Sequence, residues 1–380
     1  RVFSAIGTYV GLRGGDRYAT LVRKYEPKPI KVFLQDGAND LNNFVGDWWK
    51  ANETMERALS FAGYNVKHVW GEGGHSGQHG TAVFPQAMRW LWQDYPKPVM
   101  NAPTKNPFLT DILIPNQGWE LVGEGYSFTE GIAANDAGEV FYQDVLNGKT
   151  LKVGQDGKPT IVNSDSKKAS GTAFGPDGKR YTVSSRSKQI YRYEGTEKEK
   201  VFVDSLSGND LIVAKNGNVY ITAPDGLDKP SKIYLIRPSG EKVVVDSGGI
   251  ATGLRVANGL ALTPDQQQLY VAESASHWIW IYQVLPNGLL VNKQRYGWVH
   301  VPDTAENAWS DGLKCDRAGR IYVATRMGIQ VLDPTGRVNA ILPMPTDYPS
   351  NLCFGGPNFD VLYVTCKDKV YRRKLKVSGL

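Results

Sequence analysis

The stretch "SDGLKCDRAGRIYVATRMGIQVLDPTG", residues 310–336, contains three short apolar runs separated by two polar turns. The first run follows an Asp-Gly pair, the second is centred on Tyr322, and the third ends before a Pro-Thr-Gly turn. Short β-prone runs bounded by Gly, Asp and Pro are typical of antiparallel strands. The stretch therefore predicts three consecutive strands, which belong either to a single hairpin structure or to one copy of a repeat.

The run around Tyr322 recurs five more times, which decides in favour of a repeat. Each copy has a shorter apolar run before it and another after it, and copies lie about 40–50 residues apart. Repeats of several strands with this period are the signature of propeller blades. The related runs are "GEVFYQD" at 138–144, "GKRYTVS" at 178–184, "GNVYITA" at 217–223, "QQLYVAE" at 267–273 and "DVLYVTC" at 360–366. The sequence thus predicts a mainly β fold, a six-bladed β-propeller over residues 118–380, with "WELVGEGYSF" at 119–128 completing the last blade.

Each repeat opens on an oxygen-bearing residue, eleven or twelve positions before its aromatic residue. The first strand of a blade lines the central channel, so these side chains are expected to converge on one channel mouth. The six residues are Glu130, Ser170, Asn209, Asn258, Asp311 and Asn351. Unpaired buried carboxylates are costly, and carboxylate and carboxamide oxygens are ligands that hard cations prefer. We expect one divalent cation here, Ca²⁺ first with Mg²⁺ or Mn²⁺ as alternatives; the competing interpretation is a ring of polar residues capped by water and backbone.

The same topology predicts which loops surround this mouth. The turns between second and third strands lie there, as do the connections between blades, including the long connection 296–310. Some of these side chains are expected to contact substrate, although ordinary loop residues are the alternative for each. The rim residues are Asp144, Arg186, Asp225, His277 and Arg326, together with His300 and Trp309 from the long connection.

With these residues in place, residues 118–380 resemble the SMP-30/gluconolactonase/LRE-like family. The motifs that carry the resemblance are "TEGIA" with Glu130, "GNDLIV" with Asn209, "ANGLALTPD" with Asn258 and "SDGLKCDRAGRIYVAT" with Asp311. The resemblance implies one divalent cation, often Ca²⁺ or Zn²⁺, held by Glu130, Asn258 and Asp311, with Asn209 contacting metal or substrate. The first motif reads "EGIA" where the family commonly has "EGP", which leaves the ligand in place.

The resemblance also implies an enzyme, a hydrolase that acts on a small lactone or ester. A bound cation polarises the carbonyl and stabilises the oxyanion, and a carboxylate can take a proton from water. We expect Asp311 to be that base, with direct attack by Asp311 as the alternative. A sugar lactonase is the first interpretation, a phosphotriesterase at the same site is the second, and a sugar-binding propeller without turnover is the third.

Residues 1–97 follow a different pattern. The runs 30–37 and 65–77 read as strands, the latter passing into a loop, and the runs 47–64 and 80–92 read as helices. Alternation of strand and helix predicts a parallel sheet. The loop "GGHSG" and the earlier "DGANDLN" resemble the end of an enterochelin-esterase-like (esterase D-like) α/β-hydrolase.

That second resemblance implies the acid and histidine of a Ser–acid–His triad, at Asp40, with Asp36 as runner-up, and at His75. No G-x-S-x-G motif occurs in the 380 residues. We therefore expect residues 1–97 to be the C-terminal piece of a hydrolase domain that is silent alone, followed by a linker at 98–117. The alternatives are a small accessory domain and a carboxylesterase activity in a complete parent protein. An unpaired strand edge near residues 1–7 would favour a homo-oligomer through this segment.

Composition argues against a membrane-spanning, nucleic-acid-binding or disulfide-rich protein and against a cysteine-based zinc site. With 41% hydrophobic and 22% charged residues and no apolar run of membrane-spanning length, the chain reads as soluble and globular. The net charge of +6 is spread along the chain without a recognition motif, so no nucleic-acid partner is expected. Cys315, Cys353 and Cys366 match neither a disulfide framework nor a zinc pattern and are expected to be buried. Nothing in the sequence identifies the compartment.

Overall fold

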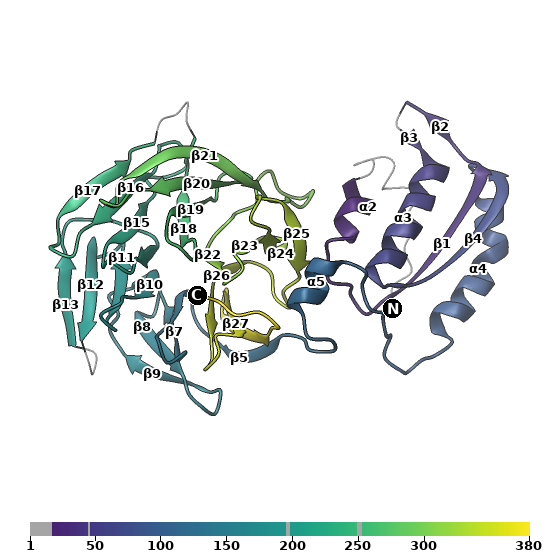
Figure 1. The fold of residues 1–380 in the computed structure, drawn as a ribbon. Helices are drawn as coiled ribbons and strands as arrows, with labels where there is room; N and C mark the ends of the chain where they lie inside the picture. Colours follow the sequence, from purple (N-terminus) through teal and green to yellow (C-terminus); the bar gives the residue numbers. More distant parts are fainter. Residues whose placement is uncertain (1–16, 45, 195–197, 249–252) are drawn as a thin grey trace. The chain divides into compact units, whose positions relative to one another are not determined.

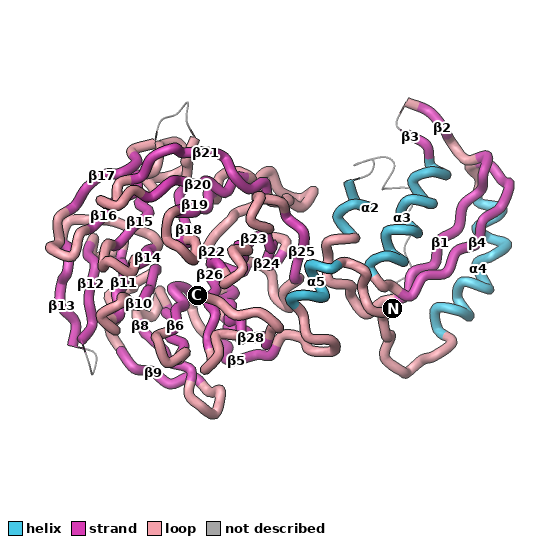
Figure 2. Tube along the Cα trace, in the orientation of Figure 1, coloured by secondary structure: helices cyan, strands magenta, loops and turns pink. Residues whose placement is uncertain are grey.

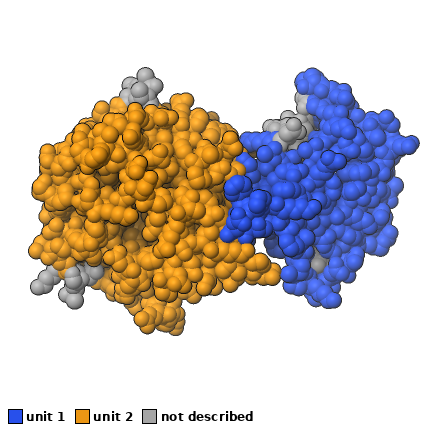
Figure 3. Space-filling view, in the orientation of Figure 1, with its two compact units in different colours: residues 1–111 blue, residues 112–380 orange. Residues whose placement is uncertain are grey.

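The computed structural model describes residues 17–44, 46–194, 198–248 and 253–380. The chain forms two compact units, Arg1–Asp111 and Ile112–Leu380, which are coloured separately in Figure 3. The strand edge expected near residues 1–7 lies outside the described residues. Helices α2 to α5 lie within residues 17–112, and the described part of unit 2 beyond them consists of strands and loops (Figure 2).

Unit 2 contains six four-stranded antiparallel sheets arranged as blades around a centre (Figure 1). This confirms the predicted six-bladed β-propeller. Blades 1 to 3 contain β6 (Thr129–Ala134), β7 (Val140–Asp144), β8 (Lys149–Val153) and β9 (Pro159–Asn163); β10 (Gly171–Phe174), β11 (Arg180–Ser184), β12 (Gln189–Glu194) and β13 (Lys198–Val203); and β14 (Leu211–Val213), β15 (Val219–Ala223), β16 (Lys232–Ile236) and β17 (Lys242–Asp246). Blades 4 to 6 contain β18 (Ala257–Leu262), β19 (Gln268–Glu273), β20 (Trp278–Val284) and β21 (Leu290–Trp298); β22 (Leu313–Cys315), β23 (Ile321–Thr325), β24 (Gly328–Leu332) and β25 (Val338–Leu342); and β26 (Pro349–Gly355), β27 (Val361–Cys366) and β28 (Lys369–Lys374).

The ring closes between the two ends of the propeller sequence. Strand β5 (Glu120–Glu124) pairs antiparallel with β28 and supplies the fourth strand of blade 6. The pairing places Glu120 beside Arg372, and their side chains are 2.9 Å apart. This pairing confirms the prediction that residues 119–128 complete the last blade. The closed ring leaves no blade without its outer strand.

The second strand of each blade is buried on both faces because each blade packs between two neighbours. All five residues of β7, β11, β15 and β23 are buried. The repeat tyrosines lie at the centre of this packing, and Tyr142, Tyr220 and Tyr322 are almost fully excluded from solvent. Each hydroxyl finds a partner; that of Tyr220 donates to the Gly288 carbonyl at 2.8 Å. The aromatic repeat is therefore a packing signal, and function must lie elsewhere in the blade.

Unit 1 is a small parallel α/β arrangement, which confirms the predicted order of its elements. Strand β1 (Lys31–Asn39) pairs parallel with β4 (Asn65–Gly74). Between and after them run α3 (Trp48–Ala62) and α4 (Gly77–Trp92), with the short α2 (Arg17–Val22), β2 (Asn42–Asn43) and β3 (Gly46–Asp47) alongside. A two-stranded parallel sheet is much smaller than a complete α/β-hydrolase sheet, so the hydrolase assignment stays a prediction.

Local signals explain where α3 begins and ends. Asp47 caps its N-terminus by accepting a hydrogen bond from the Lys50 amide, and Gly63 ends it in the left-handed conformation at φ 94°. Its buried face packs Met55 and Leu59 against β1.

The remaining helix, α5 (Pro107–Ile112), lies inside the stretch expected to be a linker, at the boundary of the two units. The boundaries 97 and 118 stay predictions. Among the described residues, no helix has the length and apolar character needed to cross a membrane.

Candidate active site

The oxygen-bearing residues that open the repeats stand at the entry of the innermost strands. Glu130 and Asn258 are the second residues of β6 and β18. Asn209 and Asp311 each precede their strand by two residues, but their amides donate to the carbonyls of Thr222 at 2.7 Å and Ala324 at 2.9 Å. These backbone hydrogen bonds attach Asn209 and Asp311 to the second strands of their blades. All four residues therefore stand at the start of an innermost strand.

Glycines beside these residues allow the inner strands to approach one another. A Cβ on Gly312 would lie 2.2 Å from Oδ1 of Asn351, and a Cβ on Gly259 would lie 2.5 Å from the Asp311 carbonyl oxygen. Each glycine follows an oxygen-bearing residue and faces the inner strand of the next blade. The Asn-Gly and Asp-Gly pairs of the repeats therefore follow from the narrowness of the channel.

Direct hydrogen bonds join the predicted ligands to one another and to a neighbour. Nδ2 of Asn209 donates to Oδ1 of Asn258 at 2.5 Å. Nδ2 of Asn351 donates to Oε2 of Glu130 at 3.1 Å and lies 3.4 Å from Oδ2 of Asp210. The channel thus contains two hydrogen-bonded groups, Asn209 with Asn258 from blades 3 and 4, and Asn351 with Glu130 and Asp210 from blades 6, 1 and 3. Asp311 of blade 5 joins the first group through the side chain of Asn258.

Burial raises the pKa of three carboxylates in the channel, and neighbouring negative charge adds to the shift for two of them. Burial and then the charge of Asp210 raise the pKa of Glu130 to about 7. Burial, followed by the charges of Glu130 and Asp210, raises the pKa of Asp311 well above its ordinary value. Burial also raises the pKa of Asp210, although the positive charge of Lys314 opposes the shift. The site therefore concentrates negative charge in a poorly solvated place, which is a frequent mark of functional sites.

Three members of this cluster went beyond the predicted ligand set. Asp210 follows Asn209 directly, yet both reach the channel because they stand before β14 starts and do not obey strand alternation. Asn351 belonged to the predicted ring but not to the expected ligands. Lys314 is charged in an inner strand, and its Nζ donates to the Leu313 carbonyl at 3.1 Å. Asp210 and Lys314 could have been found in the sequence, because each is a charged residue within an otherwise apolar strand motif.

The donors of this cluster suit a hard divalent cation. All side chains of the hydrogen-bonded set offer carboxylate or carboxamide oxygens, which Ca²⁺ and Mg²⁺ prefer over the thiolates and imidazoles that favour softer metals. Mutual repulsion of Glu130, Asp210 and Asp311 is what a cation would relieve. Across the described ranges, no three or more His, Cys, Asp and Glu side chains gather closely enough to hold a metal by themselves. A cation here would therefore depend on carboxamides such as Asn258.

The structure separates the predicted rim residues into two kinds. Asp144 ends β7 at the predicted turn, but it is buried and accepts hydrogen bonds from Ser127 and from Asn147, so it stabilises that turn. Asp225 is exposed with Lys229 3.4 Å away, and Arg186 is exposed on the turn after β11.

The other rim residues gather around aromatic rings. The ring of His277 stacks on Trp298 at 5.3 Å between centroids, and His300 meets the same indole edge-on at 5.4 Å. The guanidinium of Arg326 lies over Trp309, 5.3 Å from the ring centroid. Sequence spacing predicted these positions, whereas the stacking partners became visible only in the structure.

Unit 1 brings together the two residues of the predicted remnant triad. Nδ1 of His75 lies 2.7 Å from Oδ1 of Asp40. Asp36 is engaged elsewhere, by the Gly37 amide and by Nδ2 of Asn52, both at 2.7 Å. Partial burial raises the pKa of Asp40, but hydrogen bonds with Asp36, the Leu41 amide and His75 outweigh this effect and lower the pKa. Asp40, not Asp36, is therefore placed to orient His75.

Comparisons with known proteins bear on unit 2. A profile of the region described as SMP-30/Gluconolactonase/LRE-like matches residues 128–368. Gluconolactonase of Zymomonas mobilis is 29% identical over 234 residues, which cover 56% of this chain and 64% of that protein.

Two solved structures share the fold of unit 2. A gluconolactonase from Xanthomonas campestris superimposes with a TM-score of 0.62 at 23% identity, covering 71% of this chain and 93% of the other. A protein from Agrobacterium tumefaciens, described as calcium-binding protein regucalcin, gives 0.60 at 16% identity, covering 70% and 96%. At these identities the structural likeness concerns the fold alone.

Proposed function

The chain belongs to the SMP-30/gluconolactonase/LRE-like family, and from that membership we propose that the channel mouth of its propeller is the active site of a divalent-cation-dependent lactonase. One observation carries the proposal: three carboxylates, the buried Glu130 and Asp210 and the half-buried Asp311, stand beside carboxamides of the same channel, and burial together with neighbouring negative charge raises the pKa of Glu130 and of Asp311. Such an arrangement is costly for a metal-free protein and useful to one that binds a cation and a polar substrate.

The proposed ligands are Glu130, Asn258 and Asp311, with Asn209 in or next to the shell. Asn351 and the Gly131 amide hold Glu130 in place through hydrogen bonds of 3.1 and 2.8 Å. Asn209 and Ser274 orient the Asn258 carboxamide from its two ends. When bound, the cation would polarise the lactone carbonyl and stabilise the charge that develops on its oxygen. Ca²⁺ is the first choice because the donors are oxygens of mixed charge.

Asp311 is the proposed general base. Its carboxylate stands at the channel mouth, held by its backbone amide on Ala324, and it can accept a proton from the attacking water. Direct attack by Asp311 on the carbonyl is the alternative: the carboxylate would form a mixed anhydride as the ring C–O bond breaks and the ring oxygen leaves as a hydroxyl. Trapping of that covalent acyl-enzyme with hydroxylamine would distinguish the two routes.

The test of this proposal combines a metal titration with a substrate panel. We expect removal of divalent cations by EDTA to abolish hydrolysis of glucono-1,5-lactone, and Ca²⁺ to restore it. Calorimetric titration of the stripped protein should show one strong Ca²⁺ site per chain. Hydrolysis that persists in EDTA, in protein shown by elemental analysis to be metal-free, would contradict the proposal.

The same panel decides between reaction classes. A phosphotriester or fluorophosphate hydrolysed faster than any lactone would favour the phosphotriesterase alternative at the same site. Binding of sugar lactones without hydrolysis of either class would favour a sugar-binding propeller.

A second candidate function belongs to unit 1, because His75 and Asp40 form the hydrogen bond that two members of a triad would form. The proposal is that residues 1–97 are the C-terminal part of an enterochelin-esterase-like hydrolase domain. In a triad the histidine acts on the proton of a nucleophile, and no nucleophile motif accompanies the pair in these 380 residues. The pair is therefore proposed to be silent in this chain.

A further inference from the structure

An arginine at the channel mouth is held between two exposed aromatic rings. Arg326 occupies the turn between β23 and β24, and its guanidinium carbon lies 5.3 Å from the Trp309 ring centroid and 5.6 Å from that of Tyr348. The ammonium of Lys367, in the turn between β27 and β28, lies 4.4 Å from the centroid of Tyr348. Two cations thus share one aromatic support contributed by blades 5 and 6.

This group stands at the same end of the channel as the carboxylates. Trp309 comes two residues before Asp311, and the Arg326 amide donates to the Ala308 carbonyl at 3.1 Å. The Lys367 carbonyl accepts from the amide of Thr129, the residue before Glu130, at 2.6 Å. The two cations therefore belong to the rim that a substrate of the channel site would contact.

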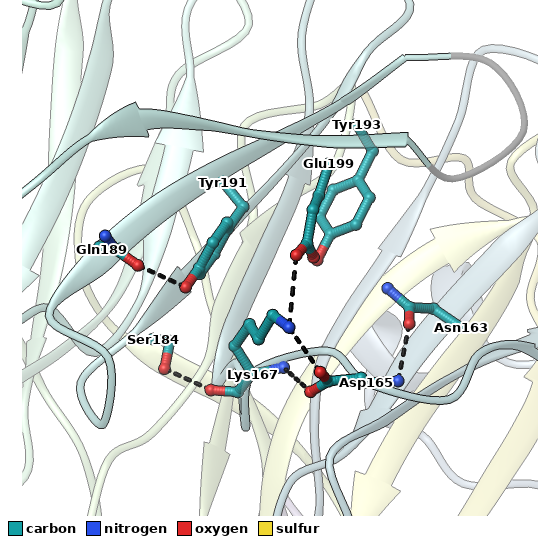
Figure 4. Close-up of polar contacts among 8 residues, drawn as sticks. All are labelled: Asn163, Asp165, Lys167, Ser184, Gln189, Tyr191, Tyr193 and Glu199. Carbon is teal, nitrogen blue, oxygen red and sulfur yellow. Dashed lines mark hydrogen bonds and ion pairs between the residues drawn. The ribbon is translucent and has the colours of Figure 1, made fainter.

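Neither cation is neutralised by the protein around it. Within the described residues, Nε of Arg326 is buried without a hydrogen-bond partner, and no carboxylate pairs with Arg326 or Lys367. Asp368, next to Lys367, lies instead 3.8 Å from Lys369. By contrast, Lys167 in the connection between blades 1 and 2 lies between Asp165, at 2.5 Å, and Glu199, at 3.4 Å (Figure 4). Lys167 is thus held by two carboxylates, whereas Arg326 and Lys367 have none beside them among the described residues.

The two aromatic residues that contact Arg326, Trp309 and Tyr348, both have strained backbone conformations. Trp309 and Tyr348 have φ angles of 45° and 65°, in the left-handed region that bulky residues rarely adopt. Both side chains remain exposed, at 39% and 47% of their possible area, so burial does not account for their conformation. Strain of this kind concentrates at functional sites, where it orients side chains toward a ligand.

We propose that Arg326 and Lys367 bind an anionic group of the substrate that does not react, so that the substrate class is a sugar lactone carrying a carboxylate, phosphate or sulfonate. The planar guanidinium, stacked on Trp309 and Tyr348, presents donors suited to a carboxylate or to a tetrahedral oxyanion. Lys367 adds a second positive charge across the Tyr348 ring. The inference rests on the proposed lactonase function and adds to it the charge of the substrate.

The test compares anionic and neutral lactones. We expect the wild-type protein to hydrolyse at least one anionic lactone, among glucaro-1,4-lactone, 6-phosphogluconolactone and 6-sulfogluconolactone, with a higher kcat/KM than glucono-1,5-lactone. The substitution Arg326→Met should lower the ratio of anionic to neutral kcat/KM by about tenfold to a hundredfold, the usual effect of losing a charged hydrogen bond. Arg326→Lys should fall between the two, and Lys367→Met should lower the ratio in the same direction. Which anionic lactone responds most identifies the anion.

Arg337→Met is the matched control, because Arg337 is an exposed arginine at the opposite end of the same blade, in the turn between β24 and β25. It should leave the ratio unchanged. A wild-type protein that prefers neutral lactones, or an Arg326→Met ratio equal to that of the control, would overturn the proposal. Thermal unfolding verifies that each variant is folded; if Arg326→Met is not, Lys367→Met and Arg326→Lys decide.

A binding measurement separates this proposal from failure of the lactonase proposal. If no lactone is hydrolysed, calorimetric titration with the open-chain acids glucarate, 6-phosphogluconate and gluconate still reports on the rim. At least tenfold tighter binding of a multiply charged acid than of gluconate, lost in Arg326→Met, would support anion recognition without lactonase activity. Equal affinities for the three acids would refute it.

Discussion

Replacing Glu130 by Gln is expected to stabilise the metal-free propeller at pH 8, although the same change removes a proposed cation ligand. Burial and the charge of Asp210 raise the pKa of Glu130 from 4.5 to about 7. Because the folded protein then binds this proton more tightly than the unfolded chain, the free energy of unfolding falls as pH rises from about 4.5 through 7. At about 1.4 kcal/mol per pKa unit, ionised Glu130 costs the folded state on the order of 3 kcal/mol at pH 8. Glutamine has the same shape without the charge.

The assay is urea unfolding in EDTA, followed by tryptophan fluorescence and performed at pH 8 and at pH 5. E130Q should exceed the wild type by about 3 kcal/mol at pH 8 and by less than about 1 kcal/mol at pH 5, where folded wild-type protein already carries the proton. Glu139→Gln is the matched control in blade 1. The side chain of Glu139 is 41% exposed and pairs with Lys152 at 2.7 Å, so loss of its charge should change stability by no more than about 1 kcal/mol.

The dependence on pH separates charge repulsion from a packing effect. Equal stability of E130Q and wild type at pH 8, or a difference of the same size at both pH values, would exclude charge repulsion at Glu130 as the cause. Addition of Ca²⁺ should reverse the order, because ligand binding stabilises only the protein that retains the site. A Ca²⁺-dependent gain in E130Q as large as that of the wild type would remove Glu130 from the proposed ligands.

Two further predictions concern the proposed catalytic groups. Asp311→Asn should lower lactone kcat roughly a hundredfold or more, which is the scale of lost general-base catalysis. A Ca²⁺-dependent gain in stability should persist in part, because the amide oxygen can still coordinate the cation. Wild-type turnover in this variant would exclude Asp311 as the base. His75→Ala should leave lactone turnover unchanged, with no hydrolysis of p-nitrophenyl esters that depends on His75. Ester turnover that disappears in this variant while lactone turnover survives would show a working second site in unit 1.

Much of the propeller could be predicted because its signals are local. Alternating apolar runs and Gly-containing turns specify individual strands, and the regular recurrence of Tyr142, Tyr220, Tyr322 and their equivalents specifies how many blades follow one another. The unpaired run at 119–128 even predicted how the ring closes, which the pairing of β5 with β28 confirms. In unit 1, helical and strand periodicity predicted a parallel arrangement, although neither could establish a complete hydrolase sheet.

Spacing along the chain was enough to predict the blade repeat and the ring of oxygen-bearing residues that opens it. The folded protein alone shows that Asp210 joins that ring, that Asn351 donates a hydrogen bond to Glu130 within it, that Lys314 lies near it, and that Arg326 lies over both Trp309 and Tyr348. These contacts connect different blades across the channel and along its rim, so their partners are far apart in sequence. Closure of the ring brings these distant residues to the same end of one channel. Charge repulsion, ring contacts and unpaired cations at that end therefore cannot be predicted from spacing along the chain.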